Sequence, residues 1–135
     1  MAENTKKYYI VDASFVLSYL LNDEQIDLVD EYFEKFTNEE ISLIAPLLLP
    51  FEVMNGLRVG VLRKRITEEV SLKLAKEFFA LFIPLEEIKL QNALKLALEN
   101  HLSVYDASYL SLTKTHNSPL LTLDKKLRAL AKQSS

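Results

Sequence analysis

Four acidic residues stand at the starts of expected helices. Asp12 directly follows the strand-like run YYIV, and Asp124 directly follows LLTL. Glu52 and Asp106 fall in the first turns of two other expected helices. Carboxylates that converge repel one another and favour a bound hard cation such as Mg²⁺ or Mn²⁺, which prefers oxygen ligands. A metal held in this way can activate water and stabilise charge on a phosphate, so these residue types favour phosphodiester chemistry.

Each acid also has a purely structural interpretation. Asp12 and Asp124 can act as helix N-caps, each worth about 1 kcal/mol. Glu52 can complement the positive end of its helix, and Asp106 can form a capping box with Ser103. These interpretations stay open for each acid taken singly. For the four together they are weaker, because a parallel sheet can bring all four helix starts to one edge.

The elements that must position these acids alternate between strand and helix. Short β-branched, aromatic or apolar runs predict strands at 7–11, 41–45, 82–86 and 119–123. Apolar residues spaced by three or four predict the helices between them. This alternation indicates an α/β fold with a parallel sheet covered on both faces. We expect a single domain over residues 1–135, because no linker, repeat or low-complexity tract divides the chain.

Composition excludes several classes of function. The chain has no cysteine, which excludes disulfides, thiolate metal sites and cysteine nucleophiles and is compatible with a cytoplasmic location. No apolar run reaches membrane-spanning length, and Asp12 interrupts the N-terminal stretch, so we expect no signal peptide. The two glycines, Gly56 and Gly60, are too few for a nucleotide-binding loop. His101 and His116 lie at expected helix ends and form no zinc-site pattern.

Four motifs occur in order between about Tyr8 and Leu130, a span that covers nearly the whole chain: IVDASFVLSYL, PFEVMNGL, SVYDASYLSL and LLTLDKKL. As an ordered set they resemble the PIN domain family, in particular the toxins of VapBC-type toxin–antitoxin pairs. The resemblance implies a three-layer α/β/α fold and a Mg²⁺- or Mn²⁺-dependent endoribonuclease. It also implies a homodimer that a cognate antitoxin protein holds inactive. Such domains often finish with a fifth strand, and the last residues, AKQSS, leave the sheet at four or five strands.

By motif, the resemblance assigns the family's catalytic, metal-binding acids to Asp12, Glu52, Asp106 and Asp124. Ser14 and Thr122 match hydroxyl positions that support the site in the family. For both hydroxyls the alternative is local capping or a contact on the strand face.

Basic and aromatic side chains near these motifs are candidates for RNA contacts. The stretch RVGVLRKR could contact phosphates beside the metals, with a solvated turn as the alternative. Its cations are Arg58, Arg63, Lys64 and Arg65. Tyr105 and Tyr109 could stack on unpaired bases, with ordinary packing as the alternative.

Other functions fit parts of the pattern. A catalytically inactive PIN-like module for RNA binding or assembly would share the fold, but it has no need of four converging carboxylates. An aspartyl phosphatase would place its nucleophile after a strand, as Asp12 is placed, but it requires a second acid where this chain has Ser14. A receiver domain requires an acidic pair near its first strand, which this chain lacks. We therefore expect a metal-dependent endoribonuclease.

Overall fold

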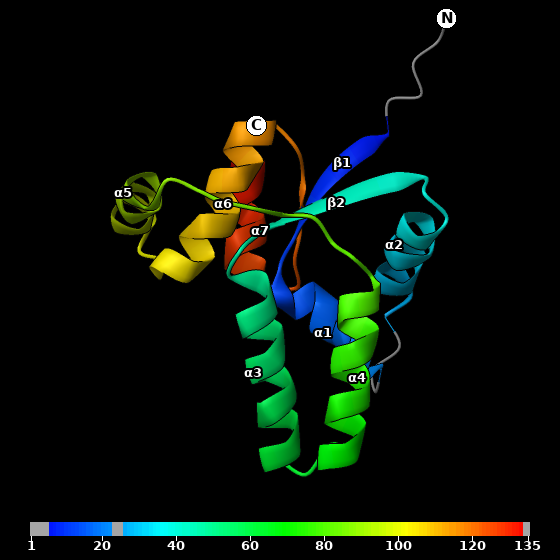
Figure 1. Ribbon diagram of the computed structural model, residues 1–135. Helices are drawn as coiled ribbons and strands as arrows, with labels where there is room; N and C mark the ends of the chain where they lie inside the picture. The colour runs from blue at the N-terminus through cyan, green and yellow to red at the C-terminus, as the bar shows by residue number, and fades with distance from the viewer. Residues whose placement is uncertain (1–5, 23–25, 134–135) are drawn as a thin grey trace, which may run out of the picture.

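A parallel β-sheet forms the centre of the computed structural model, which describes residues 6–22 and 26–133 (Figure 1). The strands are β1 (Lys7–Val11), β2 (Ile41–Pro46), β3 (Leu85–Glu86) and β4 (Leu120–Leu121). They lie in the order β3-β2-β1-β4, and each neighbouring pair is parallel. The α/β prediction is confirmed, and the described part of the chain contains four strands.

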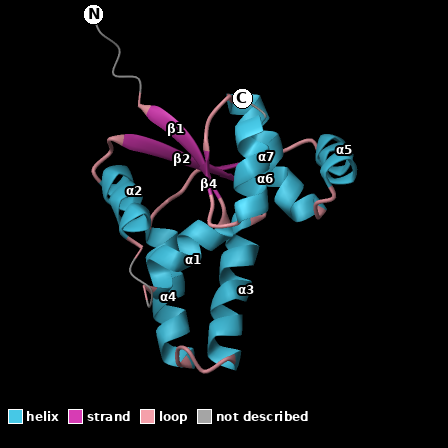
Figure 2. Ribbon diagram, turned by 180° about the vertical axis from the view of Figure 1, so that it is seen from behind, coloured by secondary structure: helices cyan, strands magenta, loops and turns pink. Residues whose placement is uncertain are grey.

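Helices cover both faces of the sheet, which gives three layers (Figures 1 and 2). The helices are α1 (Ala13–Leu21), α2 (Asp27–Thr37), α3 (Leu49–Leu62), α4 (Glu68–Ala80), α5 (Leu90–Asn100), α6 (Val104–His116) and α7 (Lys125–Gln133). On one face α6 and α7 pack against the strands, with α5 packed against α6. On the other face lie α1 and α2, and α3 and α4 form a hairpin that projects away from the sheet (Figure 1). No helix among the described residues is long and apolar enough to cross a membrane.

Two of the strands are shorter than the sequence predicts. The runs 82–86 and 119–123 form ladders of two residues each, and each ladder begins directly after a proline, Pro84 or Pro119, which has no amide hydrogen to donate. The carbonyl groups of these prolines still accept hydrogen bonds, from the amide of Ala45 at 3.1 Å and from that of Ile10 at 2.9 Å. The second ladder also ends early, and the amide of Leu123 donates to the Ser14 hydroxyl instead. Apolar spacing in the sequence predicts a helix over residues 24–37; the described helix begins at Asp27, and residues 24 and 25 lie outside the described residues.

Packing fixes the elements from which the acids project. On the α1–α2 face, the rings of Phe15 and Phe33 are fully buried, with their centroids 5.9 Å apart. On the other face, α6 is buried at every position from Ala107 to Thr113. Full burial of one large apolar side chain contributes about 1.5–3 kcal/mol. The starts of α1 and α6, where two of the acids lie, are therefore anchored by the core.

Candidate active site

The four predicted acids lie around the edge of the sheet where β1 and β4 end. Asp12 links β1 to α1, and Asp124 precedes α7, shortly after β4. Glu52 and Asp106 lie in the first turns of α3 and α6. The charge of Asp106 acts on both Asp12 and Glu52, and that of Asp124 acts on Asp106. The fold thus brings acids from four separate segments within electrostatic reach of one another.

Asp12 is the most enclosed of these acids, with 6% of its surface exposed. Its Oδ1 accepts hydrogen bonds from the Ser14 hydroxyl at 2.7 Å and the Phe15 amide at 3.1 Å. Its Oδ2 accepts a hydrogen bond from the Thr122 hydroxyl. Burial raises the pKa of Asp12, these hydrogen bonds lower it, and the negative charge of Asp106 raises it further. The carboxylate is held in one orientation in a place that disfavours its negative charge.

The two hydroxyls join the start of α1 to the turn after β4. Ser14 Oγ accepts a hydrogen bond from the amide of Leu123 at 3.0 Å and lies 3.4 Å from Thr122 Oγ1. Thr122 Oγ1 also accepts a hydrogen bond from the amide of Asp124 at 3.0 Å. Ser14 and Thr122 therefore do more than cap locally, because they bridge segments 108 positions apart in the sequence.

Glu52 is held by a tyrosine from another helix. The hydroxyl of Tyr109 donates a hydrogen bond to Glu52 Oε1 at 2.6 Å. Burial raises the pKa of Glu52, the bond from Tyr109 lowers it, and the charges of Asp106 and Asp12 raise it. Burial and the adjacent Glu52 raise the pKa of Tyr109, which therefore remains a protonated donor. The sequence gives one signal for this contact: Tyr109 lies three positions after Asp106, on the same face of the helix.

Asp106 lies in the capped first turn of α6 and interacts electrostatically with the other three acids. Its backbone amide donates to the Ser103 hydroxyl at 3.0 Å, so Ser103 is the N-cap of α6. Burial, followed by the charge of Asp124, raises the pKa of Asp106, while Ser103 and the positive charge of Lys126 lower it. Asp124 is itself an N-cap, because its Oδ1 accepts a hydrogen bond from the amide of Leu127 at 2.9 Å. The capping interpretations of Asp12 and Asp124 thus hold beside the electrostatic one, whereas at Asp106 the capping side chain is that of Ser103.

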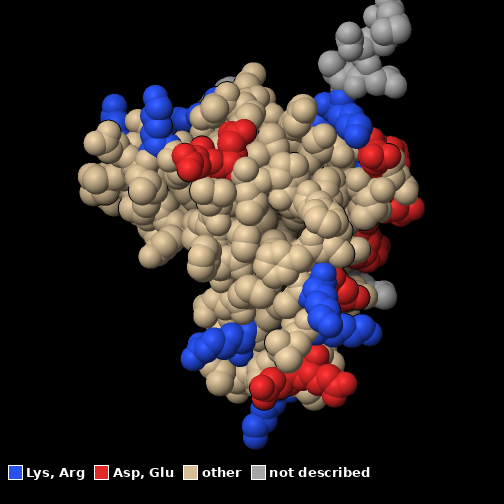
Figure 3. All heavy atoms as spheres, viewed as in Figure 1, with Lys and Arg blue, Asp and Glu red and all other residues tan. Residues whose placement is uncertain are grey.

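The basic stretch lies away from the acids. Arg63 is the C-cap of α3, and Lys64 and Arg65 follow in the turn to α4, at the tip of the hairpin. A helix rises about 1.5 Å per residue, so Arg63 lies roughly 16 Å along α3 from Glu52. Figure 3 shows basic side chains around this tip. Phosphate contacts by these residues, and by Arg58 within α3, stay a prediction, and those at the tip would lie outside the acidic cluster.

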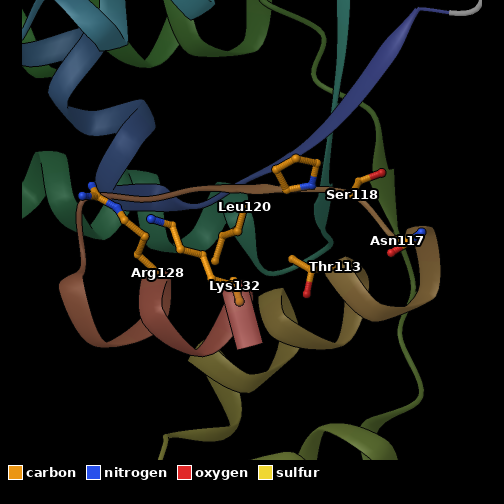
Figure 4. A pocket seen from close by; sticks show the side chains of 8 residues that line it. Thr113, Asn117, Ser118, Leu120, Arg128 and Lys132 are labelled. Carbon is orange, nitrogen blue, oxygen red and sulfur yellow. The ribbon is translucent and has the colours of Figure 1, made fainter. Parts of the chain in front are cut away.

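One hollow adjoins Glu52, and another is lined by none of the four acids. A hollow of about 400 Å³ beside Glu52 is flanked by the exposed rings of Phe51 and Tyr105. The buried Tyr109, by contrast, packs inside the fold and does not present a ring to RNA. A separate hollow of about 230 Å³ lies between the end of α6 and α7, where Arg128 and Lys132 are among the lining residues (Figure 4). Arg128 donates a hydrogen bond to the carbonyl of Thr122 at 2.7 Å.

The donor set fits a hard divalent cation, although it is not preassembled. Among the described residues, no three Asp, Glu, His or Cys side chains already form a group that could hold one metal ion. Like charges keep carboxylates apart. The fit rests on chemistry: four carboxylates offer only oxygen ligands, and the pKa of each of three is raised in part by a neighbouring acid. A cation would remove that repulsion.

Comparisons with known proteins match the chain over almost its whole length. A family model described as PIN domain matches residues 9–133. Ribonuclease VapC3 of Pyrobaculum aerophilum is 31% identical over 122 residues, which cover 87% of this chain and 90% of the relative. The crystal structure of PAE2754 from Pyrobaculum aerophilum aligns with a TM-score of 0.72 and 26% identity, over 93% of this chain and 87% of that chain. The family match spans all four segments that carry the acids.

Proposed function

The chain belongs to the PIN domain family, and from that premise we propose that it is a metal-dependent endoribonuclease. The resemblance drawn from the four motifs is confirmed, as is the fold it implies. A relative named Ribonuclease VapC3 supports an RNA substrate. The observation that carries the proposal is the placement of Asp12, Glu52 and Asp106 within electrostatic reach of other acids: burial and the charge of a neighbouring acid each raise the pKa of all three, and a bound cation would relieve both effects.

In this proposal three of the acids bind the main cation and the fourth has an additional role. Asp12, Glu52 and Asp106 would bind the main Mg²⁺ or Mn²⁺ ion. Asp124 would complete the site or help to hold a second ion. The bound cation would supply an activated water and charge stabilisation at the scissile phosphate.

The residues around the acids would set their orientation. Ser14 and Thr122 donate hydrogen bonds to opposite oxygens of Asp12 and so fix the plane of its carboxylate. Arg58 and the basic residues at the α3–α4 tip would contact RNA phosphates beyond the cluster. Fixed ligands reduce the reorganisation needed when the charge of the reacting phosphate changes.

We propose further that the protein is the toxin of a toxin–antitoxin pair. The similarity to Ribonuclease VapC3 supports a cognate antitoxin as partner. On α5, Leu90, Leu94 and Leu98 recur every fourth position and are exposed, which is the kind of surface that a protein partner covers. A homodimer or an antitoxin would bury such a stripe. Light scattering of the purified chain, alone and with a co-expressed antitoxin, tests both associations.

The activity is tested by incubating the purified protein with labelled RNA and Mn²⁺, with a chelator as the blank. Asp12→Asn and Asp106→Asn should each abolish cleavage while leaving thermal unfolding cooperative. Asp30→Asn, at an exposed acid in the first turn of α2, is the matched control and should cleave like the parent. Cleavage by Asp106→Asn at the parent's rate would show that the site is wrongly assigned. RNA binding without cleavage by the parent would favour an inactive RNA-binding module instead.

A further inference from the structure

A buried hydroxyl ties α3 to α6 at the acidic cluster. Tyr109 on α6 is 1% exposed, and its hydroxyl donates to Oε1 of Glu52 on α3 at 2.6 Å. The two residues are 57 positions apart in the sequence. Since α3 packs chiefly against α1 and α4, this bond links Glu52 to a helix on the opposite side of the sheet.

The position of the tyrosine on its helix matters as much as the bond. Asp106 and Tyr109 are three positions apart on α6, so they share one helix face. That face carries Asp106, a candidate metal ligand, and about one turn later Tyr109, which donates the hydrogen bond to Glu52, a second candidate ligand. Because α6 is buried from Ala107 to Thr113, packing fixes the helix and the side chain of Tyr109 relative to the sheet.

We infer that Tyr109 is a positioning residue, which orients Glu52 for metal binding; this inference rests on the proposed function. The hydrogen bond to Oε1 restricts rotation of the carboxylate, and Oε2 would then be the oxygen that binds a cation. Partners of this kind typically change metal affinity or activity by about 10–100-fold when they are removed. Because Tyr109 is buried, we expect it to make no contact with RNA and to act through its hydrogen bond to Glu52.

The test is Tyr109→Phe, which removes the hydroxyl and keeps the ring. Calorimetric titration with Mn²⁺ should show a dissociation constant raised by about 10-fold or more. At saturating Mn²⁺, the KM for RNA should equal that of the parent, because no RNA contact is lost. Tyr9→Phe is the matched control: Tyr9 is also a buried tyrosine, and its hydroxyl is hydrogen-bonded with Tyr32 rather than with an acid of the cluster.

A double-mutant cycle with Glu52→Gln separates positioning from general damage. If Tyr109 acts only through Glu52, adding Tyr109→Phe to Glu52→Gln should not raise the Mn²⁺ dissociation constant further. Independent effects of the two substitutions would multiply instead, and that result would overturn the inference. Thermal unfolding of each variant shows whether the fold is retained.

The outcomes distinguish this inference from the proposed function. A parent protein that neither binds Mn²⁺ nor cleaves RNA would refute the proposed function itself. A parent that does both, with Tyr109→Phe binding Mn²⁺ equally well, would refute only the role of Tyr109. Loss of cooperative unfolding in Tyr109→Phe would also refute that role, because a structural requirement would then explain the effect.

Discussion

Gly56 lies where α3 packs against Leu17 of α1, and its replacement by alanine tests how Glu52 is positioned. A Cβ atom at Gly56 would lie 2.8 Å from Cδ2 and 3.1 Å from Cγ of Leu17 on α1, with Cδ1 closer still. Gly60, one turn further along α3, provides a matched comparison. A Cβ there would meet only two atoms of Ile66, each at 3.3 Å.

Two opposing effects set the size of the difference. Alanine in a helix interior is favoured over glycine by about 1 kcal/mol. At Gly56 the overlap with Leu17 offsets this gain, because overpacking of a packed contact costs about 1–3 kcal/mol. At Gly60 the neighbour needs to shift only slightly, so most of the gain remains. We therefore expect Gly56→Ala to unfold about 4–12 °C below Gly60→Ala, taking about 4 °C for each kcal/mol in a chain of this size.

The same substitution should affect function, because Gly56 lies one turn after Glu52 on α3. Moving α3 away from α1 moves Glu52 away from Asp12, which is the N-cap of α1. A displacement of about 1 Å can cost about 100-fold in rate, so we expect Gly56→Ala to lose at least about 10-fold in metal-dependent cleavage. Gly60→Ala should cleave like the parent. Equal melting temperatures and equal rates for the two variants would refute the reasoning, because they would show that Leu17 yields and that this contact does not position Glu52.

Further outcomes follow from the charges at the site. Burial and the charge of Asp124 raise the pKa of the Asp106 carboxyl, so Asp106→Asn removes an unfavourable charge and should raise the melting temperature in a chelator by a few degrees. An unchanged or lower melting temperature would contradict repulsion between these acids. Because the carboxyl pKa of Asp106 is raised, the folded state binds more protons than the unfolded state, and stability falls as pH rises from about 3.8 through the folded pKa. The rise in melting temperature caused by Asp106→Asn should therefore be larger at pH 7 than at pH 4 in thermal unfolding curves. Mn²⁺ should raise the melting temperature of the parent and have a much smaller effect on Asp106→Asn, as scanning calorimetry would show. Thr122→Val removes a donor to the buried Asp12 and should lower the free energy of unfolding by about 1.5–3 kcal/mol in urea titrations, whereas Thr37→Val, at an exposed hydroxyl, should change it little.

The sequence predicts those parts of the site that depend on local order along the chain. Asp12 and Asp124 can be placed because each follows a short apolar strand, and Asp106 because it follows a capping serine by three positions. The contacts that cross the fold could not be predicted in this way. The bond between Glu52 and Tyr109 depends on how two distant helices meet at the sheet, and no periodicity encodes that geometry.

The limits of the predicted strands have a similarly local cause. The residues around Pro84 and Pro119 have the composition of strands. A proline has no amide hydrogen, so these two residues only accept hydrogen bonds through their carbonyl groups, and the ladders begin after them.

The basic stretch 58–65 is adjacent to the Glu52 motif in sequence, which suggested proximity to the acids. A helix of 14 residues carries the end of that stretch to the tip of the hairpin instead. Adjacency in the sequence therefore predicted the positions of Asp12 and Asp124 correctly, because each follows a strand, but not the position of the basic residues, which follow a long helix.

The four acids are held to different degrees, and in the proposed metal site this difference would assist cation binding. Both oxygens of Asp12 are hydrogen-bonded, and one oxygen of Glu52 is fixed by Tyr109. Asp106 is only half-buried and Asp124 is exposed, so these two acids can adjust at less cost. A cation that approaches the cluster would meet two oriented carboxylates and draw the other two toward them. Burial and the repulsion from Asp124 raise the pKa of Asp106; a bound cation would offset both effects, so cation binding would stabilise the fold.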